Sequence, residues 1–101
     1  MVELQPMYID GKPFTAVTVQ LPKTNLMAVY SDKGYIMCGA LDIAFFNEKL
    51  ADRGIIAGKA VGVRIIDQLL SAPLDSVTLA AEKCGIKAGM IGRDALLKMS
   101  D

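Results

Sequence analysis

The stretch that decides the fold reads Gly34-Tyr35-Ile36-Met37-Cys38-Gly39-Ala40-Leu41-Asp42-Ile43-Ala44-Phe45-Phe46. Its first part is apolar throughout and predicts a β-strand that ends at a glycine. From Asp42 the apolar period becomes that of a helix, with Asp42 as the N-cap and Gly54 as a left-handed stop. The stretch therefore divides the chain into a β-rich part, 1–39, and a part of mixed helix and strand, 40–101.

The residues before this stretch predict antiparallel strands. Residues 14–21 alternate in polarity, with Val17 and Val19 on one face, as is typical of a half-buried sheet. Asp10-Gly11 predicts a tight turn before this strand, and Pro6 places the first strand at an edge.

Two further segments, 26–30 and 35–38, are apolar on both faces. We expect them at the centre of the sheet or against another subunit. Gly34 closes the turn between them and is expected in the left-handed position of a bulged hairpin.

The second half combines one more strand with short helices. We expect the strand at about 60–64, a single helical turn at 66–70 and a final helix at about 91–99. Between the last two, a helix should begin at the N-cap Asp75 and carry Cys84 on its apolar stripe. The sequence thus predicts an α+β fold, a mainly antiparallel sheet packed with about three short helices, in a single domain spanning 1–101.

Apolar residues are unusually frequent for so short a chain. They make up 52% of 101 residues, and the mean hydropathy is +0.37. No run reaches the 18 or so apolar residues that a membrane helix needs, so we expect no membrane partner. Self-association is the favoured way to cover the surplus apolar surface.

Charge and residue usage exclude several function classes. The 11 basic and 11 acidic residues balance, and no basic stretch would follow a nucleic acid backbone, so none is expected as a partner. The absence of histidine removes imidazole catalysis and histidine metal ligands, and we expect neither a metal nor a cofactor. The N-terminal segment lacks the pattern of a secretory signal, and two distant cysteines fit a reducing compartment, so we expect a cytoplasmic protein.

Cys38 is the residue with a physical case for chemistry. It stands where a strand passes into a helix, a position at which backbone N–H groups favour a thiolate. A buried cysteine that only packs is the commoner case, and a carboxylate at Asp42 would raise the thiol pKa rather than lower it. Arg64 and Asp67 follow the expected strand and either form a rim ion pair or point into a cleft. The ligand-binding candidates are Tyr35, Cys38, Gly39, Asp42, Arg64, Asp67 and Arg93.

Two glycine patterns do not carry the functions that they suggest. Gly54 to Lys59 is one residue short of a phosphate-binding loop and lacks its Ser or Thr. Gly89-Met90-Ile91-Gly92 has the spacing of an RNA-clamping loop but few basic neighbours, and we interpret it as a helix-to-helix turn.

The chain resembles the YunC-like family, a bacterial and archaeal domain of unknown function, over nearly its full length. The resemblance implies an α+β fold whose N-terminal β-region mediates assembly of a tetramer, and it implies no catalytic residues. The motifs that carry it are Gly34-Tyr35-Ile36-Met37-Cys38-Gly39; Gly62-Val63-Arg64 with Asp67 and Leu69-Leu70; and Gly85-Ile86-Lys87 with Gly89-Met90, Gly92-Arg93 and Ala95-Leu96.

Two functional hypotheses follow. The first is a homo-oligomeric structural, regulatory or ligand-binding module without its own catalysis, whose partners are its own copies and an unidentified small ligand or protein. The second is a small thiol-dependent enzyme or redox sensor that uses Cys38, with Tyr35, Asp42, Arg64 or Arg93 of a neighbouring subunit completing its site.

Overall fold

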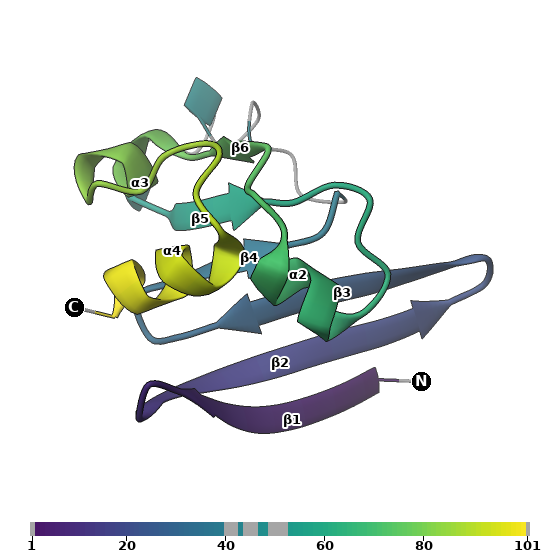
Figure 1. The fold of residues 1–101 in the computed structure, drawn as a ribbon. Coiled ribbons are helices and arrows are strands. Elements are labelled where there is room, and N and C mark those ends of the chain that lie inside the picture. The colour runs from purple at the N-terminus through teal and green to yellow at the C-terminus, as the bar shows by residue number, and fades with distance from the viewer. Residues whose placement is uncertain (1, 40–42, 44–46, 49–52, 101) are drawn as a thin grey trace.

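A computed structural model describes residues 2–39, 43, 47–48 and 53–100 of the chain, and its main feature is a six-stranded sheet (Figure 1). The strands lie in the order of the sequence, and every neighbouring pair is antiparallel except β4 and β5, which are parallel. The strands are β1 (Val2–Ile9), β2 (Lys12–Leu21), β3 (Thr24–Tyr30), β4 (Gly34–Met37), β5 (Ile56–Lys59) and β6 (Ser76–Val77).

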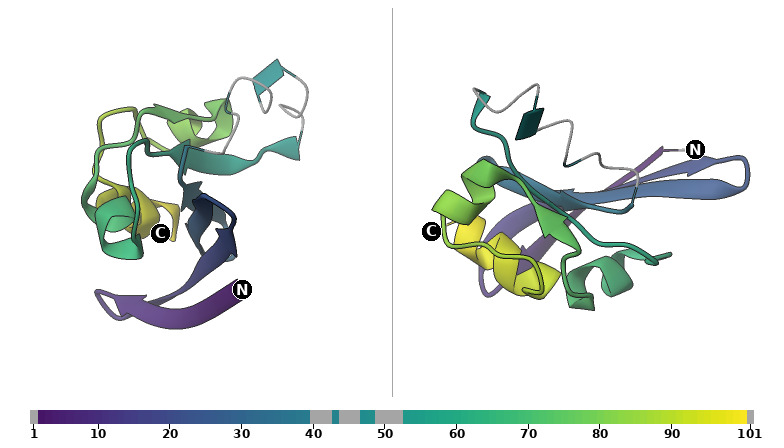
Figure 2. Two further views of the ribbon diagram at one scale, coloured as in Figure 1. Left: turned by 90° about the vertical axis from the view of Figure 1, so that its right-hand side faces the viewer. Right: turned by 90° about the horizontal axis from the view of Figure 1, so that it is seen from above.

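Within residues 53–100, the structure has three short helices. They are α2 (Ile66–Ser71), α3 (Leu79–Lys83) and α4 (Gly92–Met99). Figure 2 shows α2 and α4 on the same side of the sheet. The predicted α+β class, with a mainly antiparallel sheet and about three short helices, is confirmed. None of these helices, within the described part of the chain, is long and apolar enough to cross a membrane.

Strands β1 to β3 form a meander joined by two-residue turns. Asp10 and Gly11 both have positive φ, 51° and 79°, which is the type I′ geometry that suits a hairpin. The next turn consists of Pro22 and Lys23, and Lys23 is left-handed with φ 66°. Pro6 lies in the edge strand β1, as its missing N–H predicts.

The core lies between the sheet and the helices. Val29 and Ile36 of the sheet and Leu69, Ile86 and Leu96 of the second half are all fully buried. β3 and β4 occupy the middle of the sheet, one of the two places expected for strands that are apolar on both faces.

The strand expected at 60–64 was wrong, because β5 covers Ile56–Lys59 instead. Gly62 has φ 74°, a left-handed conformation that ends an extended segment. Val61, a β-branched residue that favoured the strand prediction, is 53% exposed and lies in a surface loop.

Gly34 was also assigned the wrong role. It is buried at the start of β4 and its φ is not positive. A Cβ there would lie 2.5 Å from the carbonyl oxygen of Ile56, so the glycine permits the close approach of β5.

The helix expected to begin at Asp75 begins later, and its N-cap is Thr78. Ser76 and Val77 pair with β5 as β6, so the sheet takes the residues assigned to the first helical turn. Cys84 is exposed after the last residue of α3 rather than part of an apolar stripe.

The helix expected from Asp42 to Gly54 falls largely outside the described residues, and Asp42 is one of these. Ile43, Asn47 and Glu48 are helical. Gly54 has φ 64°, the left-handed conformation predicted for it.

Candidate functional site

Cys38 is the first residue after β4 and is held by contacts to β3. Its backbone N–H donates to the carbonyl oxygen of Met27 at 3.0 Å, and its sulfur accepts from the N–H of Met27 at 3.5 Å. The thiol points to the carbonyl oxygen of Asn25 at 4.0 Å. With 6% of its surface exposed, Cys38 belongs to the hydrophobic core.

Because β4 and β5 are parallel, the residues that follow them lie close together, at the edge of the sheet formed by the carboxyl ends of these two strands. The N–H of Ala60, directly after β5, donates to the carbonyl oxygen of Met37 at 3.0 Å. A Cβ on Gly39 would lie 3.7 Å from Cγ1 of Val61. The first half of β3 reaches the same edge, because Asn25 and Met27 contact Cys38 there.

A cavity of about 540 Å³ lies at this edge and is open to solvent. One wall is the turn between β2 and β3, and the other is the loop after β5. Cys38 stands behind the first wall, since its sulfur contacts Asn25 and Met27. The lining residues are Leu21, Lys23, Thr24, Asn25, Met27, Val63 and Arg64.

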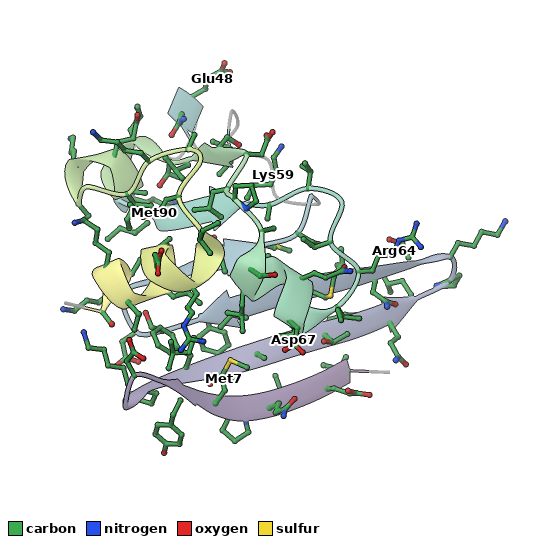
Figure 3. All side chains as sticks on the ribbon, viewed as in Figure 1. Met7, Glu48, Lys59, Arg64, Asp67 and Met90 are labelled. Carbon is green, nitrogen blue, oxygen red and sulfur yellow. The ribbon has the colours of Figure 1, made fainter. Side chains whose placement is uncertain are left out.

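Arg64 is an exposed residue in the second wall, the loop after β5. Figure 3 places it over the end of the meander. Its backbone N–H donates to Oε1 of Gln68 at 2.7 Å, which fixes the loop against α2. Asp67 is exposed on α2 and does not line the cavity. No ion pair joins Arg64 to Asp67 in the part of the chain that the structure describes.

Tyr35 lies on the opposite face of the sheet from Cys38. It packs against Ile43 and Ala57, and partial burial raises the pKa of its hydroxyl. The structure therefore does not bring Tyr35 and Cys38 together within one chain.

Arg93 is at the other end of the meander from Cys38. Its guanidinium lies 3.5 Å from the carboxylate of Asp10 in the turn between β1 and β2. Of the sequence candidates, Cys38, Gly39 and Arg64 gather at one edge. Asp67 is displaced from the cavity, and Asp42 lies outside the described residues.

Metal binding has no geometric support in the described segments, where no three cysteine or carboxylate side chains converge. The glycine pattern Gly89-Met90-Ile91-Gly92 before α4 has a structural role. The N–H of Gly92 donates to the carbonyl oxygen of Ala72 at 3.0 Å.

Sequence reasoning did not single out Lys23, Thr24 and Asn25 as site residues. One signal marks the first of them: the second central position of a Pro-X turn favours Gly or Asn, because φ is positive there. A lysine at that position is unusual.

Sequence and structure comparisons place the chain among proteins without an assigned role. "Uncharacterized protein YunC" of Bacillus subtilis (strain 168) is 73% identical over 99 residues, which is 98% of both proteins. The crystal structure of TA1206, a protein of unknown function from Thermoplasma acidophilum, matches with a TM-score of 0.87 and 30% identity over 98% of this chain and 93% of that one. The family described as "Domain of unknown function (DUF1805)" matches residues 37–99.

The chain belongs to the DUF1805 family. The YunC-like resemblance seen in the sequence is thereby confirmed. The DUF1805 match begins at Met37, the last residue of β4, so it includes Cys38 and Arg64 but not Lys23. The cavity thus joins a wall from the DUF1805 segment to a wall from the preceding meander.

Proposed function

We propose that this DUF1805 protein is a homo-oligomeric module, structural, regulatory or ligand-binding in role and without catalysis of its own. Its copies associate through the face of β1–β3 that points away from the helices. The YunC-like resemblance implies a tetramer. The observation that carries the proposal is the composition of this open face.

The open face follows from the strand register. Phe14, Ala16 and Met27 point into the core, so the alternate residues of each strand point the other way. These residues pair across β1–β3 in five rows, none of which contains a charged side chain. The rows are Leu21-Thr24, Val2-Val19-Leu26, Leu4-Val17-Ala28, Pro6-Thr15-Tyr30 and Tyr8-Pro13.

Apolar side chains on this face are open to water in the single chain. Leu4 is 65% exposed, Val2 62% and Tyr30 42%. No described helix covers this face of β1–β3, as Figure 2 shows. Monomeric proteins rarely expose a contiguous apolar surface of this kind, and stacking a second sheet about 10 Å away would bury it.

The cysteines support a reducing compartment such as the cytoplasm. Both are free, and Cys84 is exposed. An exposed thiol stays unpaired in reducing surroundings and is prone to oxidation outside them.

The test compares two neighbouring substitutions that point to opposite faces of β1. Leu4 and Gln5 are both exposed in the single chain, so neither lysine variant should unfold it. Light scattering coupled to gel filtration should give a multiple of 10.8 kDa for the wild type and for Gln5→Lys. Leu4→Lys should give a monomer, because it places a charge within the apolar rows. A monomeric wild type, or equal masses for both variants, would contradict the proposed interface.

A further inference from the structure

We propose that the cavity between the β2–β3 turn and the loop after β5 binds a small organic carboxylate. This goes beyond the assembly proposed above and uses different residues. Cations from the two walls would hold the carboxylate group, and the few apolar residues of the lining would contact a short hydrocarbon body.

The first argument for an anionic ligand is the positive charge of the cavity lining. Lys23 and Arg64 line the cavity together, and its lining contains no acidic residue. The whole chain is neutral, with 11 basic and 11 acidic residues, so this pair is a local excess of positive charge. An anion is the ligand that such a site attracts.

The second argument is that the lining side chains have hydrogen-bond donors available for a ligand. Among the described residues, neither Lys23 nor Arg64 has a side-chain partner. The side chains of Thr24 and Asn25 likewise make no hydrogen bond within the described part of the protein. A guanidinium offers a planar pair of donors that matches a carboxylate, and the ammonium adds a second charge from the facing wall.

Apolar residues make up the smaller part of the lining, and a bare inorganic anion would leave them without contact. Leu21, Met27 and Val63 line the same cavity as the two cations. Binding sites that combine an apolar wall with a few convergent polar groups suit ligands that carry both kinds of surface. The lining therefore favours a carboxylate with a short aliphatic chain over phosphate.

The backbone of Lys23 agrees with this assignment. Its φ of 66° is a conformation that glycine or asparagine adopts at lower cost. The turn between Leu21 and Thr24 nevertheless carries a lysine, and this lysine lines the same cavity as Arg64.

The test is an NMR titration of the ¹⁵N-labelled protein with butyrate, with butyramide as the neutral isostere and inorganic phosphate as the second anion. Butyrate should shift the amide signals of residues 23–25 and 63–64 saturably, with a dissociation constant of about 1 mM, as is reasonable for so small a ligand. Butyramide should shift none of them, because it lacks the charge. Absence of a saturable butyrate response, or saturation by phosphate alone, would overturn the proposal.

Single substitutions test which cationic side chains bind butyrate. Arg64→Gln and Lys23→Gln should each weaken butyrate binding about tenfold, since each removes one charge-assisted contact. Lys87→Gln changes the net charge equally but lies outside the cavity lining, so it should bind as the wild type does. Equal weakening in all three variants would mean a general charge effect and would contradict the site.

The monomeric Leu4→Lys variant separates the two proposals. Leu4 does not line the cavity, so this variant should keep the butyrate response after it has lost assembly. A wild type that proves monomeric but binds butyrate would leave the cavity proposal standing. Loss of the response in Leu4→Lys would contradict a site built within one chain.

Discussion

The hydroxyl of Thr78 donates a hydrogen bond of 2.6 Å to the carbonyl oxygen of Ile55. The hydroxyl oxygen of Thr78 also accepts from the backbone N–H groups of Ala57, at 3.1 Å, and Ala81, at 3.2 Å. One buried hydroxyl thus joins β5 to the first turn of α3 and serves as the N-cap of that helix.

Replacement of Thr78 by valine should lower the free energy of unfolding by about 2–3 kcal/mol. The change removes the helix cap and leaves the N–H of Ala57 and the carbonyl of Ile55 without this partner. Urea denaturation followed by circular dichroism measures the difference. Thr78→Ser retains the hydroxyl and is the control, expected to lose less than half as much. Equal losses would assign the effect to packing of the methyl group.

Lys23→Gly should raise the free energy of unfolding by up to about 1 kcal/mol, because glycine adopts the positive φ of this position without strain. Thermal denaturation checks the shift. Thr24→Gly is the matched control, since Thr24 is an extended residue of β3 and should be destabilised by the same change. The Lys23→Gly variant should also lose butyrate affinity, so stability and binding would move in opposite directions.

Alkylation should distinguish the two thiols. Cys84 is exposed, whereas Cys38 is buried and reaches reagent only when the structure opens. Iodoacetamide followed by peptide mass spectrometry should label Cys38 about 100-fold more slowly than Cys84. A Cys84→Ser variant gives the rate of Cys38 alone. Rapid labelling of Cys38 in the folded protein would instead favour the thiol-based function considered from the sequence.

Tyr35 should make stability fall at high pH. Burial disfavours its phenolate and raises its pKa above the ordinary value of about 10. The folded state therefore holds the proton more tightly than the unfolded state, and this contribution is fully present below about pH 10 and is lost as the pH rises through the folded pKa.

Unfolding free energies measured between about pH 8 and about pH 11 test this dependence. Tyr35→Phe should show a shallower decline than the wild type across the upper part of that range. Tyr8→Phe alters a ring that is 75% exposed and should leave the decline unchanged. An unchanged profile in Tyr35→Phe would show that another group is responsible.

Local signals predicted the meander well. The Asp10-Gly11 turn, the edge position of Pro6 and the two-sided apolar strands each depend on neighbouring residues alone. The errors lie where contacts between segments far apart in the sequence determine the local structure. Gly34 is explained by the approach of Ile56, and the residues before α3 are taken into the sheet by pairing with β5. Neither contact is visible in a local sequence pattern.

The site was predicted only in part for the same reason. Cys38 was chosen because it ends a strand, and the parallel pairing of β4 with β5 brings it and Gly39 to the same edge as the loop after β5. Arg64 was chosen as the end of a strand expected at about 60–64, but it lies in that loop. Tyr35 was suggested as a residue that a neighbouring subunit could add to the Cys38 site, which a single chain does not test. Within one chain, alternation along β4 turns Tyr35 to the opposite face from Cys38. Lys23 could be connected to Arg64 only by knowing how the meander lies against the loop after β5.

The connections of the sheet also set an order of folding. β1 to β3 are joined by two-residue turns, so their pairing closes short loops and should be complete within microseconds to milliseconds. β5 can align with β4 only after the chain between Met37 and Ile56 has closed, at a greater entropic cost. A newly made chain therefore displays its uncharged sheet face before its helices have docked. The window between these two events is when premature association, and the need for chaperone protection, should be greatest.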